Sequence, residues 1–177
     1  MGEELLLWLV ALGVAIVLGA PTVLQMVYGG PRIEVDFTRD HQGNLFCDVY
    51  NRPVSNRFLV HLPVRREKAC ISVGFQIRTA ENNGLILGTT IPSALINDQF
   101  AVLDKIDLPA SNSPLSAMIV QISGIGAGVY NSNGVRISLP IAIYRMEMLV
   151  MAAEKNIHTQ RNFVVTADPT KTYWADS

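Results

Sequence analysis

The sequence is poor in cysteine and histidine. Its two cysteines, Cys47 and Cys70, belong to no CxxC pair and to no zinc-ligand spacing. Two cysteines define no disulfide framework, so we expect buried free thiols on neighbouring strands, with pairing in an oxidising compartment as the alternative. The three histidines, His41, His61 and His158, lack the paired spacing of zinc hydrolases. The sequence therefore predicts no metal site.

Neither sign of charge predominates. The 177 residues include 14 Lys and Arg against 15 Asp and Glu, which gives a formal net charge of −1. General nucleic-acid binding depends on a basic surface that neutralises phosphates. This balance of charge therefore argues against nucleic acid as a partner.

Familiar catalytic motifs are missing as well. There is no Gly-x-Ser-x-Gly nucleophile elbow, and the glycine-rich segment 124–128 lacks the GxGxxG spelling of a dinucleotide site. We expect a bend or bulge there. Asp36, Asp40 and His41 surround one predicted hairpin and are acid–base groups, but a solvent-facing strand and a turn explain them adequately. The sequence thus predicts no enzyme, no catalytic residue and no cofactor.

One long hydrophobic run is present near the amino terminus. Residues 5–28 carry no charge, and Thr22 and Gln25 are their only clearly polar side chains. At a rise of 1.5 Å per residue the run reaches roughly 36 Å as a helix, enough to cross a hydrocarbon layer of about 30 Å. We therefore expect a short tail at 1–4 and a transmembrane helix at 5–28, with the lipid bilayer as a partner.

Two alternatives compete for the same segment. A cleaved signal peptide begins with basic residues, whereas Glu3 and Glu4 precede this run. A core helix of a soluble protein has one polar face, whereas this segment is apolar on every face. Both alternatives are therefore weaker than the transmembrane helix.

Basic residues follow the run but do not precede it. Arg32 and Arg39 come soon after it, and cytoplasmic flanks of membrane helices are enriched in Lys and Arg. We expect a single-pass protein of the cell membrane whose large domain is cytoplasmic. An outward-facing domain is the alternative.

A second group of cations lies further along the chain, opposed within its segment only by Glu67. We weigh two interpretations, a patch that faces anionic lipid and an ordinary solvated face. The five cations are Arg52, Arg57, Arg65, Arg66 and Lys68.

The rest of the chain predicts one β-rich domain at 32–167, joined to the helix by a glycine- and proline-containing linker at 29–31. Apolar and acidic residues alternate along 32–38, as in a half-buried strand. We expect a turn at 40–44, an irregular segment at 91–114 and a short helical turn around Ala94. Further strands are predicted at 45–50, 57–62, 69–78, 84–90, 116–123, 134–139, 143–152 and 158–166. Short, closely spaced strands favour an antiparallel β-sandwich.

Leu139 and Pro140, followed by Tyr144 on an alternating strand, resemble the tyrosine-corner region of immunoglobulin-like and fibronectin type III-like sandwiches. This resemblance implies a mainly β fold, an antiparallel immunoglobulin-like β-sandwich, preceded here by one transmembrane helix. It also implies that the Tyr144 hydroxyl bonds to nearby backbone in a structural role. The layout as a whole resembles small prokaryotic membrane proteins of uncharacterised function.

A carboxyl-terminal tail is expected at 168–177. Tyr173 and Trp174 make it a candidate docking tail, because tyrosine and tryptophan are favoured interface anchors. Alternatively, Trp174 folds back over the edge of the sandwich. These features together predict a membrane-anchored binding or scaffolding module with a protein partner. An outward-facing envelope or surface recognition domain is the alternative, and a membrane-tethered hydrolase that uses Asp40 and His41 ranks third.

Overall fold

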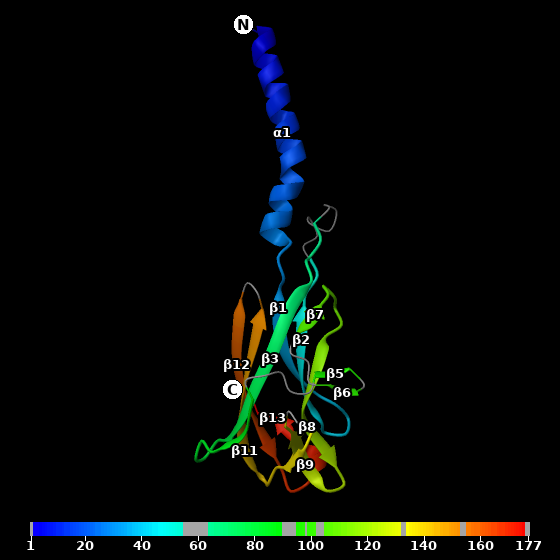
Figure 1. The fold of residues 1–177 in the computed structure, drawn as a ribbon, viewed down its shortest axis with the longest axis vertical. Helices are drawn as coiled ribbons and strands as arrows, with labels where there is room; N and C mark the ends of the chain where they lie inside the picture. Colours follow the sequence, from blue (N-terminus) through cyan, green and yellow to red (C-terminus); the bar gives the residue numbers. More distant parts are fainter. Residues whose placement is uncertain are drawn as a thin grey trace.

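The computed structural model describes residues 2–54, 64–89, 95–97, 99–101, 105–131, 134–152 and 155–175. One long helix, α1 (Gly2–Tyr28), projects from a mainly β region that contains the rest of the described chain (Figure 1). The helix begins at Gly2, so residues 2–4 of the expected tail are helical.

Within α1, the segment Leu7–Tyr28 is long and apolar enough to cross a membrane. The rest of the described chain leaves it exposed, so no soluble core covers its apolar side chains. Pro21 lies inside the helix, which continues on both sides of it. A signal sequence near the amino terminus meets the same criteria of length and composition.

The described strands form two antiparallel sheets. The first sheet has the order β1-β2-β8-β5-β6, and β9 and β10 extend it from β8. Its strands are β1 (Ile33–Arg39), β2 (Leu45–Asn51), β5 (Leu95–Asn97), β6 (Gln99–Ala101), β8 (Leu115–Ser123), β9 (Gly126–Tyr130) and β10 (Arg136–Ser138).

The second sheet has the order β13-β12-β11-β3-β4, with β7 paired to β3. Its strands are β3 (Ala69–Thr79), β4 (Leu85–Thr89), β7 (Ile106–Leu108), β11 (Ala142–Ala152), β12 (Asn156–Val165) and β13 (Tyr173–Trp174), with the short helix η1 (Pro169–Lys171) before β13. Its central pair joins β3 to β11, which are far apart in the sequence.

Side chains from both sheets meet in one core. Alternate residues of β11, namely Tyr144, Met146, Met148 and Val150, are buried, as the period of two predicts for a strand with one inward face. The sulfur atoms of Met148 and Cys47 lie 3.2 Å apart, so β11 of the second sheet contacts β2 of the first. The two sheets therefore form the two layers of one domain.

The prediction for the cysteines is wrong in two respects, the burial of Cys70 and the placing of the two cysteines on neighbouring strands. Cys47 is buried on β2, and burial in the core raises the pKa of its thiol, with smaller contributions from Asp48 and Asp36. Cys70 is exposed on β3, in the other sheet. Both cysteines are free. The two do not lie on neighbouring strands because β2 and β3 belong to different sheets.

Most predicted strands that lie in the described ranges are present, with ends shifted by one or two residues. The glycine-rich segment contains a turn at Gly124 and Ile125, after which β9 begins at Gly126. The segment 91–114 was expected to be irregular, but its described parts contain β5, β6 and β7. The predicted strand at 57–62 and the helical turn around Ala94 lie outside the described residues.

The turn expected at 40–44 connects β1 to β2. The Asp40 carboxylate accepts hydrogen bonds from the backbone N–H groups of Gln42 (2.9 Å) and Asn44 (2.8 Å). Gly43 has a φ of +91°, and a Cβ there would lie 2.9 Å from the carbonyl oxygen of Thr170. Glycine therefore suits this position both for its backbone conformation and for the close approach of η1.

The segment expected as a carboxyl-terminal tail contains η1 and β13, and β13 pairs with β12 in the second sheet. The ring of Trp174 packs against Phe37 of β1 and Phe163 of β12, at centroid distances of 4.9 and 5.8 Å. Its indole N–H donates to the carbonyl oxygen of Thr38 (2.9 Å). This arrangement matches the alternative in which Trp174 covers the sandwich edge, whereas Tyr173 is 46% exposed.

The Tyr144 hydroxyl donates a hydrogen bond to the carbonyl oxygen of Pro140, 2.8 Å away. The ring is buried and stacks on Phe163 at a centroid distance of 5.2 Å. Burial raises the pKa of this phenol, so the hydroxyl remains a donor at neutral pH. It thereby fixes the β10–β11 connection against the start of β11.

We expect Tyr144→Phe to lower the free energy of unfolding by about 1 kcal/mol, because it removes one hydrogen bond and keeps the buried ring. Urea denaturation of the full chain in detergent micelles, followed by tryptophan fluorescence, measures this change. Tyr173→Phe is the matched control, since Tyr173 is nearly half exposed. Equal losses in both variants would contradict a specific role for the Tyr144 hydroxyl.

Candidate functional site at the helix junction

The end of α1 is held against the β domain by direct hydrogen bonds. We call the residues that make this connection, 25–34, 51–52 and 64–68, the helix junction. Its backbone bonds include Glu67 N–H to the Gly29 carbonyl (2.7 Å) and Arg52 N–H to the Arg32 carbonyl (2.9 Å). These bonds therefore restrict the movement of the helix relative to the domain.

A glutamine of the helix contributes a second connection. The Gln25 side-chain amide donates to the carbonyl oxygen of Arg65 (2.8 Å) and accepts from the Arg65 backbone N–H (3.0 Å). A Cβ at Gly29 would overlap the Gln25 amide, so this contact requires glycine there. We call the Gln25–Arg65 pair of bonds the glutamine clamp.

Asn51, at the end of β2, is fully buried and is the most highly connected side chain of the junction. Its amide donates to the carbonyl oxygens of Glu67 (2.7 Å) and Leu108 (3.1 Å) and accepts from the Arg32 backbone N–H (3.0 Å). Its own carbonyl oxygen accepts from the N–H of Ser111 (2.9 Å). One residue thus joins the linker, the 64–68 segment and β7.

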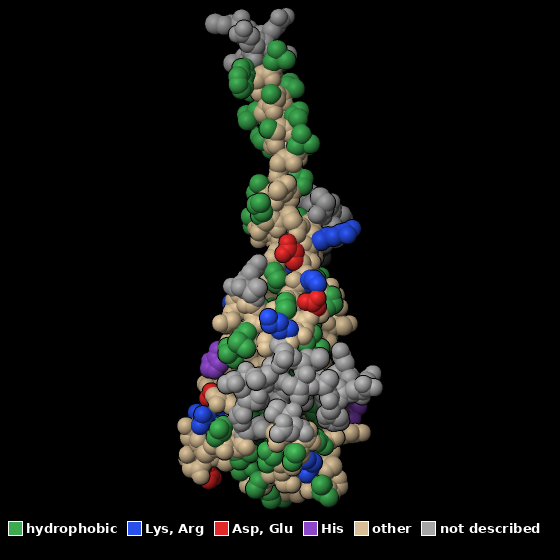
Figure 2. All heavy atoms as spheres, viewed as in Figure 1, with side chains coloured by type: hydrophobic (Ala, Val, Ile, Leu, Met, Phe, Trp, Pro, Cys, Tyr) green, Lys and Arg blue, Asp and Glu red, His purple; other side chains and the backbone are tan. Residues whose placement is uncertain are grey.

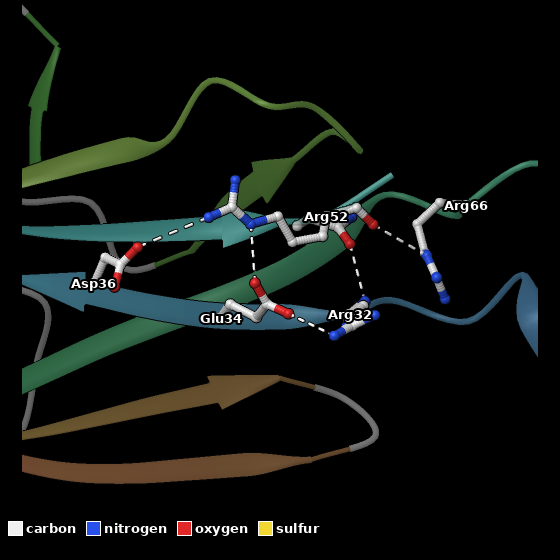
Figure 3. Close-up of polar contacts among 6 residues, drawn as sticks. Arg32, Glu34, Asp36, Arg52 and Arg66 are labelled. Atoms are coloured by element: carbon white, nitrogen blue, oxygen red, sulfur yellow. Dashed lines mark hydrogen bonds and ion pairs between the residues drawn. The ribbon is translucent and has the colours of Figure 1, made fainter. Parts of the chain in front are cut away.

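Charged side chains of the junction and of β1 are linked to one another by polar contacts (Figure 3). Glu34 bridges Arg32 and Arg52 at 2.8 and 2.9 Å, and Arg52 lies 3.8 Å from Asp36. The Arg52 guanidinium also stacks 3.6 Å from the centre of the Tyr50 ring. The hydrogen bond from Arg52 is the main cause that lowers the pKa of Glu34.

Arg66, in the 64–68 segment, bonds to the linker. Its guanidinium donates to the carbonyl oxygens of Gly30 (2.6 Å) and Arg52 (3.2 Å). Burial, followed by the nearby charge of Arg32, lowers the pKa of Arg66. Arg66 is therefore a cation that bonds to neutral backbone groups of the junction.

The structure divides the five cations proposed as a lipid-facing patch. Arg52 is bound to acidic residues of β1, and Lys68 pairs with Asp107 at 2.5 Å, which raises the Lys68 pKa. Arg65 is exposed and has no acidic partner within the described ranges. Arg57 lies outside the described residues. Only part of the sequence-based patch is therefore brought together beside α1.

The acid–base residues considered for a hydrolase are not arranged as a site. Asp40 accepts bonds within the β1–β2 turn, His41 is exposed in the same turn, and Asp36 lies on β1 near Arg52. Among the residues that the structure describes, no three His, Cys, Asp or Glu side chains are placed to hold a metal ion.

Gln25 and Asn51 are residues of this candidate site that the sequence did not predict. For Gln25 a signal existed, because it is one of two polar side chains in the apolar run. Asn51 had none, since its three side-chain hydrogen bonds are to residues distant in sequence. In space-filling view, charged side chains gather at the level where α1 meets the domain (Figure 2).

Searches with protein-family models, among curated proteins and among solved structures find no match to this chain.

Asn51→Ala is expected to lower the free energy of unfolding by on the order of 3 kcal/mol. It removes the Asn51 donor from the buried carbonyl oxygen of Leu108 and the partly buried one of Glu67, and the acceptor from the Arg32 N–H. Urea denaturation of the full chain in detergent micelles measures the loss. Asn156→Ala removes an exposed side chain from the β11–β12 hairpin and should change stability by no more than about 0.5 kcal/mol. A similarly small effect at Asn51 would show that the junction does not depend on its amide.

Proposed function

We propose that this chain is a single-pass membrane protein whose β domain acts as a binding or scaffolding module close to the bilayer surface. The helix junction carries this proposal, because hydrogen bonds from Gln25, Glu67 and Arg66 attach the domain directly to the last turn and linker of α1. A domain joined by a flexible tether would need no such contacts. Anchoring would then restrict the module to the plane of the membrane in one orientation.

We further propose that the domain is an immunoglobulin-like sandwich in the broad sense. Two antiparallel layers with one shared core and the Tyr144–Pro140 hydrogen bond support this assignment. In such domains the loops at the ends of the sandwich commonly carry the binding function. The fold thus supplies a rigid platform for exposed loops.

Apolar side chains are exposed on loops at the end of the domain remote from α1. Ile125, between β8 and β9, is 79% exposed, and Ile141, between β10 and β11, is 68% exposed. Exposed apolar side chains on loops are suited to contact with another protein. We therefore place the partner-binding surface at this end.

The cytoplasmic side is the favoured location of the domain. Arg32, Arg65 and Arg66 all lie in the helix junction, at the carboxyl-terminal end of α1. The positive-inside rule relates cations beside the end of a membrane helix to the cytoplasmic side. An outward-facing recognition domain is the competing proposal.

The two cysteines allow a direct test of orientation. Cys70 is exposed and Cys47 is buried, so a membrane-impermeant maleimide should label only Cys70 in the folded protein, and Cys70→Ser is the control that loses the label. We expect labelling after cell lysis but not on intact cells. Labelling on intact cells would contradict the cytoplasmic orientation and support the outward-facing one.

A photo-crosslinking amino acid tests the binding function in intact cells. Placed at Ile125, it should form a discrete adduct with another protein, because this position is exposed at the proposed contact surface. His158, exposed on β12, is the matched control position and should form none. The same amino acid placed at Tyr173 tests the candidate docking tail. An adduct at Tyr173 but not at Ile125 would move the contact to that tail. The absence of an adduct at both positions would argue against a binding module.

A further inference from the structure

The glutamine clamp fixes the height of Arg65 relative to the apolar helix. Gln25 lies within one turn of Tyr28, the last residue of α1, and both polar atoms of its side chain bond to the Arg65 backbone. The apolar segment Leu7–Tyr28 has 22 residues, which corresponds to about 33 Å of helix. Because the hydrocarbon layer is about 30 Å thick, the clamp places the Arg65 backbone at the depth of the lipid headgroups.

Two cations at this level are not neutralised by acids within the described chain. The Arg65 side chain is exposed and its long apolar stem can extend along the membrane boundary. Arg66 bonds only to carbonyl oxygens, and a guanidinium has five N–H donors, so donors remain for a further acceptor. Glu67 is the acidic residue of the 64–68 segment and is exposed. Its backbone N–H donates to the carbonyl oxygen of Gly29.

The other cations of the junction differ from Arg65 and Arg66 because they are already paired with acidic residues. Arg32 and Arg52 share Glu34, and Lys68 is bound to Asp107. The nearby Arg32 charge also contributes to the lowered pKa of Arg66, after burial. An anion bound at Arg66 would oppose that repulsion.

We propose that Arg65 and Arg66 together bind the headgroup phosphate of an anionic phospholipid at the end of α1. The inference rests on the proposed membrane anchoring and names a lipid as a second partner of the helix junction. Guanidinium groups suit this ligand because their planar N–H donors match the geometry of phosphate oxygens. Juxtamembrane cations also gain from the negative surface potential of an anionic leaflet. Bound lipid would hold the domain in its orientation on the membrane.

Native mass spectrometry of the full chain in detergent micelles tests this site with phosphatidylglycerol and phosphatidylcholine as probes. The unmodified chain should bind phosphatidylglycerol more tightly. Arg65→Gln should weaken that binding roughly fivefold, the effect of one juxtamembrane cation, and it leaves the clamp intact because the clamp uses backbone atoms. Arg65→Gln combined with Arg66→Gln should weaken it by more.

Lys68→Gln is the matched control, since it removes an exposed cation that is already paired. Its phosphatidylglycerol affinity should stay within twofold of that of the unmodified chain. An unchanged affinity in Arg65→Gln, or an equal loss in Lys68→Gln, would overturn the inference. The first result would exclude Arg65 from the site, and the second would indicate a general effect of net charge.

Alkaline carbonate extraction of membranes that contain the same variants separates this inference from the proposed function. Release of the unmodified chain into the soluble fraction would overturn membrane anchoring itself. A chain that stays in the membrane but shows no preference for phosphatidylglycerol over phosphatidylcholine would overturn only the lipid site. Retention in the membrane with the expected loss at Arg65 would support both.

Discussion

The buried amide of Asn51 joins three segments that no single sheet connects. The side chain accepts a hydrogen bond from the N–H of Arg32, which follows the linker, and donates to the carbonyl oxygens of Glu67 and Leu108. Asn51 is also the last residue of β2 in the first sheet. An aspartate would lack the two donors and a leucine would lack every polar group. The path of the chain from α1 into β1, and from the 64–68 segment into β3, therefore depends on an amide at this position.

Around this centre, the charges of the junction are distributed unevenly. Glu34 holds Arg32 and Arg52 on the first sheet, and Asp107 holds Lys68 beside the second. Exposed ion pairs of this kind contribute little to stability, so their main effect is on which cations stay available. The junction cations without an acidic partner among the described residues are Arg65 and Arg66, which are attached to the end of the helix, where the proposed membrane surface would lie.

In another part of the domain, the last strand, β13, packs against the first strand, β1. Trp174 of β13 contacts Phe37 of β1 and Phe163 of β12, so one aromatic side chain spans the two layers. The turn at Gly43 also fits against Thr170. The domain is thus closed by contacts between its first and last segments, and its stability depends on the carboxyl-terminal residues.

Local pattern accounts for what the sequence by itself determined. The uncharged run specified α1, and the alternation of apolar and polar residues specified β1, β3 and β11, because helix and strand periods appear directly in neighbouring residues. Leu139, Pro140 and Tyr144 likewise lie within a few positions of one another, so their arrangement could be anticipated. Short strands such as β7 and β13 show no period long enough to recognise.

Only the tertiary structure decided the composition of the helix junction. Gln25 and Arg65 are 40 positions apart, and Asn51 and Leu108 are 57 apart, so no local pattern relates them. The exposure of Cys70 and the pairing of Lys68 with Asp107 depend on which sheet each strand joins. Such contacts follow from how two layers pack around one core, and that packing is a property of the whole chain rather than of any segment.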